Sequence, residues 1–595
     1  MAVVVMKPRL SDLPFLAGAA PDVIAALEEE SEWFSVPAGW SVMRAGEPAD
    51  GVFFLISGSL AAFRPVDLGG HKLLGYIRPG EPVGEMALIA REPHSSSVFA
   101  MRDSELLRLS PEAFDRLMEA HPKLMQRVAR LMLSRARMQG RDNARADPKI
   151  YALISTSPTI DLKLRARTLQ SALARLGKRV AIVGDECEHV DSRWFDKLES
   201  ENDAVFLMSP IADTPWFRTC LRQADRIWVL ARADARPSVP LFPAEEPSPA
   251  RAFRLVDVIL LHHGSDRKAA TTDEWRIAAD AARLFHWRGL ADEDAARLAR
   301  IVARRSIGLV LSGGGARAYA HIGVVRALRE AGLPFDTCGG TSMGAIVAAC
   351  AAMGWNDDEI EVRIRKAFVE SNPLGDYVLP VVSLSSGKRV EDRLQEHFGE
   401  VLIEDLEVPF FAVSTNLTTA GIRVHRAGLL RQTLRASISL PGILPPVIEG
   451  DNILVDGAVL KNFPVDVLKD LHRGPIIGVD VAQQEGINAD DFRHPPGFFG
   501  WVAAHGLQAA PPIASLLIRA ATLAVDPWEG RSATDLLVIP DMPDVDLRDW
   551  RKFDEAVSAG YESTVAALQR PHGLFQAPVS PIGALPGNHA LEIAE

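Results

Sequence analysis

Residues 307–328 read IGLVLSGGGARAYAHIGVVRAL, and residues 338–354 read CGGTSMGAIVAACAAMG. Each stretch joins a short apolar run, through glycines, to a run with helical spacing, which is the pattern of a strand, a tight turn and a helix. Strands that alternate with helices of this length pair in parallel through right-handed crossovers. The region from about 304 to 570 is therefore predicted to be an α/β domain with a mainly parallel sheet.

The second stretch contains a GxSxG pattern centred on Ser342. Small residues at both ends of this pattern allow a sharp strand-to-helix turn that lifts the serine hydroxyl clear of the backbone. The following residues are apolar on nearly every side, so we expect a buried helix whose positive end faces the serine. The alternative is a glycine-rich turn before a core helix, with a bystander serine.

Three consecutive glycines, 313 to 315, lie between the first strand and its helix. Their N–H groups could turn toward one point, as an oxyanion hole requires. A phosphate-cradling loop is the alternative, but the lysine of such loops is missing. Asp456 ends an apolar strand in NILVDGAVL and is the candidate base. Burial would raise its pKa and suit it to proton transfer, although a lone Asp-Gly pair is also an ordinary turn.

Four motifs, GGGAR, GGTSMGA, ASISLPGILPP and VDGAVLKNFPVD, occur in the order and at about the spacing seen in patatin-like phospholipases. Together they span roughly residues 306–480. The resemblance implies a dyad without histidine, in which Ser342 is the nucleophile and Asp456 the base. Ala318 stands where the family usually has glycine. The resemblance assigns the oxyanion hole to Gly313, Gly314, Gly315 and Arg317.

Wider similarity, including residues 371–399 and 410–421, makes the chain resemble bacterial relatives of neuropathy target esterase. The resemblance implies a serine esterase that acts on phospholipids or lysophospholipids, without a cofactor or metal. A Ser-His-Asp triad using His321, His425 or His472 is the mechanistic alternative, but a lone histidine is more often structural. The alternative from another functional class is a regulated lipid- or cyclic-nucleotide-binding scaffold with a vestigial esterase site.

From about 35 to 110, strand-length runs are separated by glycines, which predicts a small β-barrel closed by one or two helices. Residues 83–101, VGEMALIAREPHSSSVFAM, resemble the phosphate-binding cassette of cyclic-nucleotide-binding domains. His94 stands where working sensors have arginine, and a mostly neutral imidazole is a poor partner for phosphate. We therefore expect a degenerate barrel used for docking or regulation, and micromolar binding of cyclic AMP or GMP would overturn this. The resemblance assigns any nucleotide contacts to Gly84, Glu85, His94 and Ser95.

The predicted domains are the cyclic-nucleotide-binding-like barrel (1–145), a middle α/β domain (146–303), the patatin-like domain (304–570) and a proline- and glycine-rich tail (571–595). The middle domain alternates strands and helices, but its first loop lacks the glycines and lysine of a phosphate site. Its similarity to the linker region of the esterase relatives implies a scaffold.

The composition is ordinary for a globular chain: 595 residues, 47% hydrophobic and 24% charged. The net charge of −12 argues against nucleic acid as a partner. The four cysteines form no CxxC pair, which fits a reducing compartment and no metal. No run reaches the length of a spanning helix; residues 497–524 come nearest and are broken by prolines. We expect a cytoplasmic protein with peripheral contact at the inner membrane face, and homo-oligomerisation stays open.

Overall fold

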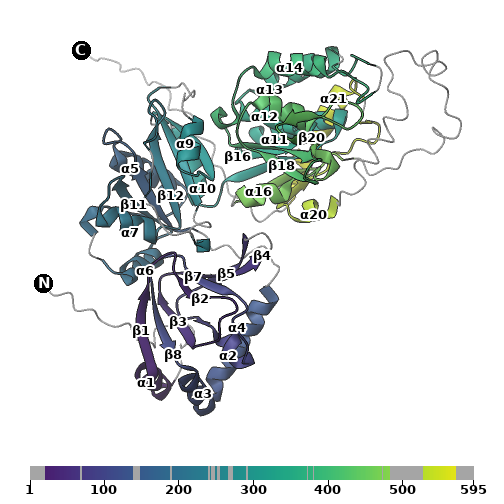
Figure 1. Ribbon diagram of the computed structural model, residues 1–595. Helices are drawn as coiled ribbons and strands as arrows, with labels where there is room; N and C mark the ends of the chain where they lie inside the picture. The colour runs from purple at the N-terminus through teal and green to yellow at the C-terminus, as the bar shows by residue number, and fades with distance from the viewer. Residues whose placement is uncertain are drawn as a thin grey trace, which may run out of the picture. The chain divides into compact units, whose positions relative to one another are not determined.

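The chain divides after Ala303 into two compact units, shown in Figure 1. The computed structural model describes residues 20–66, 70–138, 148–187, 190–238, 241–242, 248–250, 255–264, 272–289, 292–371, 373–378, 381–471, 474–482, 527–547 and 549–570. The predicted tail and the apolar segment 497–524 therefore lie outside the described residues.

The first unit begins with the predicted small barrel, made of two four-stranded antiparallel sheets in the orders β1-β8-β3-β6 and β2-β7-β4-β5. Glycines with positive φ, such as Gly58, form the tight turns between its short strands. The barrel and its helices are α1 Pro21–Glu30, β1 Ser31–Val36, β2 Ser41–Met43, β3 Val52–Ser57, β4 Leu60–Val66, β5 Gly70–Ile77, β6 Pro82–Val83, α2 Glu85–Ala90, β7 Ser97–Ala100, β8 Ser104–Leu109, α3 Pro111–Ala120 and α4 Pro122–Met138.

A parallel six-stranded sheet of order β10-β11-β9-β12-β13-β14 forms the rest of the first unit. The strands are apolar on both faces because helices cover both: α5 and α10 contribute to one core, and α6, α7 and α9 to the other. The elements are β9 Ile150–Ser155, α5 Leu162–Arg175, β10 Val180–Val183, α6 Ser192–Glu201, β11 Ala204–Pro210, α7 Pro215–Gln223, β12 Arg226–Arg232, β13 Leu255–His262, α9 Thr272–Ala278, β14 Arg283–Arg288 and α10 Asp292–Val302.

The second unit is an eight-stranded sheet of order β19-β20-β17-β16-β15-β21-β22, with β18 paired to β17. Its central pairs are parallel, as predicted, whereas β18, β19 and β20 pair antiparallel. The elements are β15 Ile307–Leu311, α11 Ala320–Glu330, β16 Phe335–Thr341, α12 Met343–Ala352, α13 Asp357–Ile364, α14 Lys388–Phe398, β17 Phe410–Asn416, β18 Gly421–His425, α15 Leu430–Ser437, β19 Val447–Glu449, β20 Asn452–Asp456, α16 Val465–Leu471, β21 Ile476–Val479, α20 Pro527–Ser532, β22 Leu536–Val538 and α21 Phe553–Gln569.

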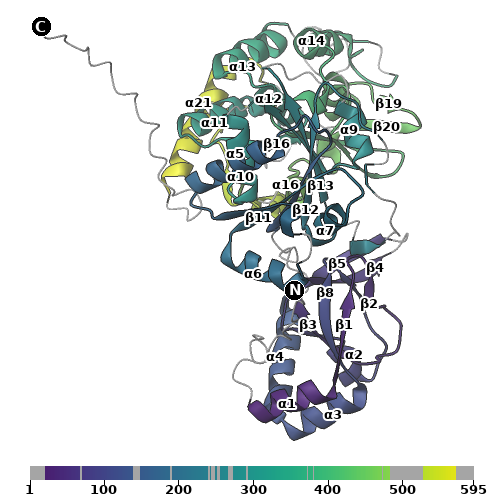
Figure 2. The same cartoon turned by 90° about the vertical axis from the view of Figure 1, so that its left-hand side faces the viewer.

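Helices α11 and α21 pack side by side against the sheet of this unit (Figure 2). Glycines make this close packing possible. A Cβ atom on Gly323 would lie 2.0 Å from the carbonyl oxygen of Val557, and one on Gly560 would lie 1.9 Å from that of Ala320. The C-terminal helix is thereby held against the helix that follows the glycine loop.

Strand β17 pairs with two strands in succession along one edge. Residues 410–413 pair with β16, and residues 414–416 pair with β20. Because β18 occupies the opposite edge at residues 412–416, β16 and β20 must share the same edge, end to end. The residue that follows β16 is Ser342, and β20 ends on Asp456 opposite Ser414. This arrangement brings together two residues that are far apart in the sequence.

Candidate active site

Ser342 occupies the turn between β16 and α12, with φ 55° and ψ −131°. This is backbone geometry that L-residues rarely adopt, and it costs on the order of 1–3 kcal/mol unless the surroundings enforce it. The two flanking glycines allow close packing against the end of β15. A Cβ atom on Gly340 would lie 2.2 Å from the carbonyl oxygen of Leu311, and one on Gly344 would lie 2.3 Å from that of Ser312. The turn therefore requires the small residues of the GxSxG pattern.

The Ser342 hydroxyl donates a hydrogen bond of 2.7 Å to Oδ2 of Asp456. Asp456 is 2% exposed, and its Oδ1 accepts a 2.8 Å bond from the Ala458 N–H. Burial raises the pKa of Asp456 to about 7, while the bonds from Ala458 and Ser342 oppose this shift. The pair thus combines a hydroxyl with a carboxylate whose pKa lies near neutrality, which suits general-base chemistry.

The end of α15 contacts both members of the pair. The fully buried Ser437 hydroxyl accepts the Ser342 N–H at 2.9 Å and donates to the carbonyl of Val413 at 2.7 Å. Two residues later, the carbonyl of Ser439 accepts the Asp456 N–H at 2.8 Å. Sequence reasoning gave these serines no role, although both belong to the ASISLPGILPP motif. One short segment therefore holds the backbone of both Ser342 and Asp456.

We expect Ser437→Ala to lower kcat for ester hydrolysis about 10- to 100-fold with little change in KM, because Ser437 is a positioning residue for the Ser342 turn. The change also removes the hydrogen bonds of the Ser437 hydroxyl to the Ser342 N–H and the Val413 carbonyl, which should destabilise the fold by about 1–3 kcal/mol. Steady-state kinetics and thermal unfolding measure both effects.

Thr564→Ala is the matched control for this substitution. The Thr564 hydroxyl is also fully buried, and it donates to the carbonyl of Gly560 at 2.7 Å within α21. Its loss should lower the melting temperature without changing kcat. Ser437→Thr, which keeps the hydroxyl, should recover part of the activity. Equal kcat values for Ser437→Ala and the wild type would rule out the positioning role.

The glycine loop lies directly beside Ser342. A Cβ atom on Gly313 would lie 3.1 Å from Cβ of Ser342 and 2.5 Å from Oδ1 of Asn462. The Gly313 N–H donates to the backbone carbonyl of Asn462 at 3.2 Å. In return, the side-chain amide of Asn462 donates to the carbonyl of Gly313, also at 3.2 Å. The N–H groups of Gly314 and Gly315 donate to no other described residue. These two, rather than the Gly313 N–H, are available to an oxyanion.

The Arg317 side chain, which follows the glycine loop, connects it to two other segments by hydrogen bonds. Its guanidinium donates to three backbone carbonyls, at 2.9, 2.8 and 2.6 Å, and the side chain is 9% exposed. These carbonyls belong to the end of β21 and to the segment before α21. The arginine therefore ties three separate parts of the chain together behind the loop. The acceptors are Val481, Met542 and Val545.

Two of the three histidines considered for a triad have other hydrogen-bond partners. His321 Nε2 lies 2.8 Å from the carbonyl of Ser312, and complete burial lowers its pKa to about 4. His425 Nε2 lies 2.7 Å from the Ser414 hydroxyl, and burial lowers its pKa to about 4 as well. His472 lies outside the described residues. The partner of the Ser342 hydroxyl is the Asp456 carboxylate.

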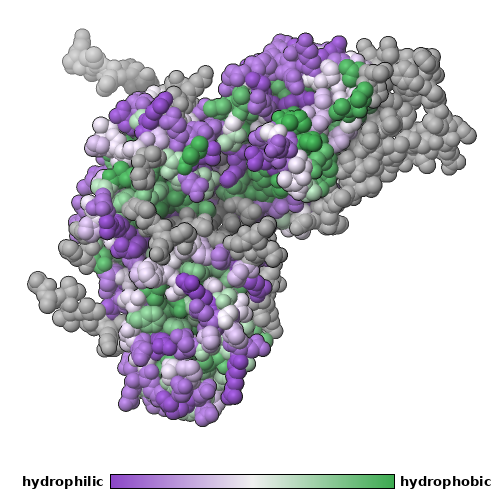
Figure 3. Space-filling model, viewed as in Figure 1, coloured by the Kyte–Doolittle hydropathy of each residue, from purple (hydrophilic) through white to green (hydrophobic). Residues whose placement is uncertain are grey.

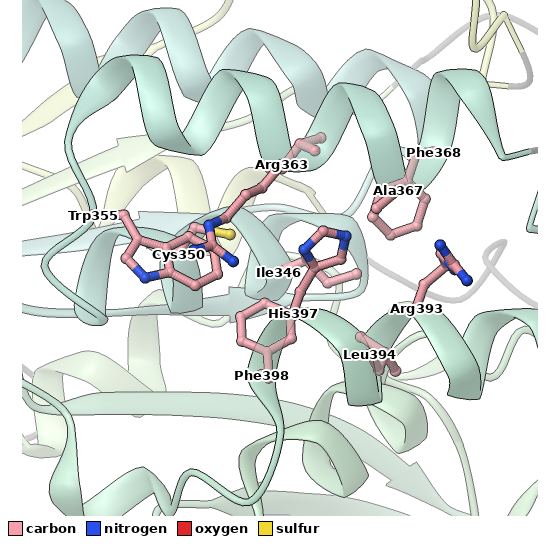
Figure 4. Close-up of a pocket in the computed structure, with 11 residues that line it drawn as sticks. Ile346, Cys350, Trp355, Arg363, Ala367, Phe368, Arg393, Leu394, His397 and Phe398 are labelled. Atoms are coloured by element: carbon pink, nitrogen blue, oxygen red, sulfur yellow. The ribbon is translucent and has the colours of Figure 1, made fainter.

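A separate small crevice of about 20 Å³ lies between α12, α13 and α14 (Figure 4). Ile346 and Cys350 project into it from α12, and Trp355 stacks on Phe398 with 5.5 Å between ring centroids. The basic side chains drawn in Figure 4, Arg363 among them, surround an apolar interior. Neither member of the Ser342–Asp456 pair lines this crevice, so we assign it to the packing of the helices.

In the barrel, the structure brings together most residues of the doubtful nucleotide site. The Cβ position of Gly84 lies 3.7 Å from Cε1 of His94, which is 5% exposed and whose Nε2 has no partner among the described residues. Glu85, the next residue, is 1% exposed and bonds to Arg135 of α4 at 2.7 Å. Ser95 follows His94 with an exposed side chain. The Glu85 carboxylate, which the resemblance assigns to nucleotide contact, therefore already accepts a hydrogen bond from an arginine.

The described part of the chain was also searched for metal-binding clusters and for helices that could span a membrane. No group of three or more histidine, cysteine, aspartate or glutamate side chains there is arranged to hold a metal ion. None of the described helices combines the length and the apolar character that crossing a membrane requires.

Three segments match known protein families. Residues 309–469 match the patatin-like phospholipases, residues 33–121 the cyclic nucleotide-binding domain, and residues 163–279 the neuropathy target esterase (NTE) family P-loop like domain. The first segment contains the Ser342–Asp456 pair and the glycine loop, and the second contains all of the barrel except the first two residues of β1. The matches follow the order of the domains predicted from the sequence.

Relatives match this chain over different shares of its length. An uncharacterized NTE family protein of Mycobacterium tuberculosis is 30% identical over 593 residues, which cover 95% of this chain and 96% of that protein. The rat patatin-like phospholipase domain-containing protein 7 is 28% identical over 76% of this chain, which corresponds to 38% of the rat protein. Among solved structures, the catabolite activator protein of Thermus thermophilus is 24% identical over 28% of this chain and 71% of its own, with a TM-score of 0.20.

Proposed function

Because this chain belongs to the NTE family, we propose that it is a serine esterase that hydrolyses acyl esters of phospholipids or lysophospholipids through Ser342 and Asp456. The predicted resemblance to patatin-like phospholipases is confirmed, and the family identifies the chain as a lipid hydrolase. The observation that carries the proposed dyad is the 2.7 Å bond between the serine hydroxyl and a buried carboxylate.

The first half of the reaction transfers the acyl group to the serine. Asp456 accepts the hydroxyl proton while Oγ of Ser342 forms a bond to the ester carbonyl carbon, whose oxygen becomes an oxyanion. Collapse of this tetrahedral intermediate breaks the bond to the alcohol, and the leaving oxygen takes the proton from Asp456. The products of this half-reaction are a free alcohol and an acyl-serine.

The second half returns the enzyme to its starting state. A water molecule gives a proton to Asp456 and attacks the acyl-serine, and the second tetrahedral intermediate collapses to a fatty acid. The proton on Asp456 returns to Oγ. In both intermediates the N–H groups of Gly314 and Gly315 are the donors we assign to the oxyanion, supported by the positive end of α12. Gly313 contributes by leaving room beside the serine.

The pH dependence of the reaction tests this proposal. Only the carboxylate form of Asp456 can accept a proton, and its pKa is about 7. We therefore expect kcat/KM for fatty-acid release from lysophosphatidylcholine to rise with pH and to level off above about pH 7 to 8. Fatty-acid release measured between about pH 5 and pH 9 gives this profile.

Two results would contradict the proposal in different ways. An esterase whose rate does not change across neutral pH would exclude Asp456 as the titrating base. If the wild type releases no fatty acid from any phospholipid or lysophospholipid and does not react with a fluorophosphonate probe, the vestigial-site scaffold becomes the better description.

We also propose that the barrel serves docking or regulation rather than cyclic-nucleotide sensing. Two observations support this. Burial lowers the pKa of His94, so that the imidazole at the phosphate-contacting position is neutral near pH 7. The Glu85 carboxylate is engaged by Arg135, so a ribose hydroxyl would have to displace that arginine.

A further inference from the structure

Arg435 is a buried arginine on α15, the helix that ends beside the Ser342–Asp456 pair. It is 5% exposed. Figure 3 shows hydrophilic side chains on the outside of the second unit where Figure 1 labels the neighbouring helix α14. Arg435 is not part of that surface, because its contacts lie between α15, the start of α14 and the residues that follow α15. A charged side chain is therefore enclosed close to the candidate active site.

The guanidinium bonds to both ends of the segment 439–445, which follows α15. Nη1 donates to the Ser439 hydroxyl, and Nη2 donates to the Pro445 carbonyl at 3.1 Å. The Ser439 hydroxyl donates back to the Arg435 carbonyl at 2.6 Å. One planar side chain with several donors in a fixed geometry therefore holds the segment at two points.

This segment is the one that contacts Asp456. The Ser439 carbonyl accepts the Asp456 N–H at 2.8 Å. Ser437, which lies between Arg435 and Ser439 in the chain, accepts the Ser342 N–H. The Arg435 side chain is thus connected to the backbone of Asp456 through a single residue, Ser439.

A glycine at the start of α14 makes room for the guanidinium. Gly387 has φ +77°, and a Cβ atom on it would lie 2.7 Å from Nη2 of Arg435 and 3.2 Å from Cδ of Pro445. A larger residue there would push against the arginine or against the segment that it holds. The enclosure of Arg435 therefore depends on contacts from two separate parts of the chain.

Ion pairing does not explain why a charge is buried here. Among the described residues, Arg435 pairs with Glu391, which is 63% exposed and whose carboxylate lies 3.5 Å from Nε. Burial lowers the pKa of the guanidinium, so that enclosing its charge costs folding free energy. An exposed partner at this distance offsets little of that cost. The hydrogen bonds to Ser439 and Pro445 are the better explanation.

We propose that Arg435 is a positioning residue for the Ser342–Asp456 pair. By holding residues 439–445 at both ends, it fixes the Ser439 carbonyl and, through it, the backbone of Asp456 relative to Ser342. The inference rests on the proposed function, because it concerns the alignment of the same pair. Proton transfer requires the two groups to stay within about 0.5 Å of the productive geometry. Arg435 supplies this restraint without touching the reacting atoms.

A double-mutant cycle in the full-length chain tests the proposal. We expect Arg435→Gln and Ser439→Ala each to lower kcat for p-nitrophenyl butyrate about 10- to 100-fold with little change in KM, because each removes the same connection. The double variant should lose no more than the more damaged single variant. Arg435→Lys, which keeps the charge and one donor group, should recover part of kcat. If Arg435→Gln does not fold, Arg435→Lys and Ser439→Ala form the cycle instead. Independent losses that multiply, or a kcat equal to that of the wild type, would overturn the proposal.

Arg365→Gln is the matched control. Arg365 also joins distant parts of the second unit: it pairs with Glu361 at 3.1 Å and with Asp554 of α21, and it lies 4.2 Å from the ring centroid of Phe553. None of these partners belongs to the segment that holds the pair. Its loss should lower the melting temperature without changing kcat. An equal fall of kcat in both arginine variants would assign the effect to general destabilisation and overturn the positioning role.

Amide hydrogen exchange measures the alignment without relying on activity. The N–H groups of Ser342 and Asp456 are both held by the end of α15 and the residue pair that follows it. Peptides that contain either residue should exchange about tenfold faster in Arg435→Gln than in the wild type, and at the wild-type rate in Arg365→Gln. Unchanged exchange in both peptides of Arg435→Gln would contradict the inference.

The two proposals can fail separately. If the wild type neither hydrolyses esters nor reacts with a fluorophosphonate probe, but Arg435→Gln exchanges faster in both peptides, the esterase proposal fails and the positioning role stands. If the wild type hydrolyses the ester and Arg435→Gln matches it in kcat and in exchange, the positioning role fails and the esterase stands.

Discussion

The Ser342→Ala variant is expected to lose ester hydrolysis by about 10⁴-fold or more, because no other side chain can form the acyl intermediate. Its hydroxyl is the donor to Asp456, and its position at the start of α12 places it beside the glycine loop. The variant should also lose all labelling by a fluorophosphonate probe. Fatty-acid release and probe labelling, measured side by side with the wild type, check both statements.

Ser342→Gly is the informative companion to this substitution. Both variants lack the hydroxyl, so both should be equally inactive. They differ in the backbone, because glycine adopts a φ of 55° without strain and alanine does not. We expect the glycine variant to unfold at a temperature about 2–4 °C higher than the alanine variant, which corresponds to about 1 kcal/mol. Identical melting temperatures would mean that the turn is not strained.

Asp456→Asn is expected to reduce kcat by about 10³- to 10⁴-fold, because an amide cannot accept the serine proton. The same change should alter stability in a pH-dependent way. Burial raises the pKa of Asp456 from 3.8 to about 7 in the folded state, so the folded protein binds a proton that the unfolded chain has released. The wild type therefore loses folding stability between about pH 4 and pH 7 and stays at the lower value above that range.

The asparagine variant has no charge to bury and should escape this loss. At about pH 8 it should be more stable than the wild type by on the order of 4 kcal/mol, and the difference should shrink toward zero near pH 4. Urea unfolding at the two pH values measures the difference. If the difference in stability between the wild type and the variant is the same at both pH values, the pKa of Asp456 is not raised in the folded protein.

The sequence led to Ser342 and Asp456 as candidates, and the structure places them in hydrogen-bond contact. GxSxG describes a turn that forms within a few residues, and the glycine loop is likewise a local feature. Asp456 needed the ordered family motifs, because an Asp-Gly pair is common and nothing nearby in the sequence connects it to Ser342. The fold class followed from the alternation of strands and helices, and the mainly parallel sheet is confirmed.

What the sequence could not predict depends on contacts between distant segments. The bond from the Gly313 N–H to Asn462 spans 149 positions of the chain (462 minus 313). The roles of Ser437 and Arg317 depend in the same way on where β17, β21 and the segment before α21 come together. Likewise, the exposure of Ile448 and Ile453 follows from the position of β19 at the edge of the sheet. None of these features has a signature in the local sequence.

The shared edge of β17 has a consequence for how this enzyme can evolve. The alignment of Ser342 and Asp456 is set by the register of β16 and β20 on one seven-residue strand and by the end of α15, so only loops outside these segments can vary in length without separating the pair. Loops there can gain or lose whole segments, and with them new specificities, without separating the pair. A deletion of one residue within β17 or β20 would instead turn Asp456 to the other face of the sheet. Variation should therefore accumulate between these strands and be excluded within them.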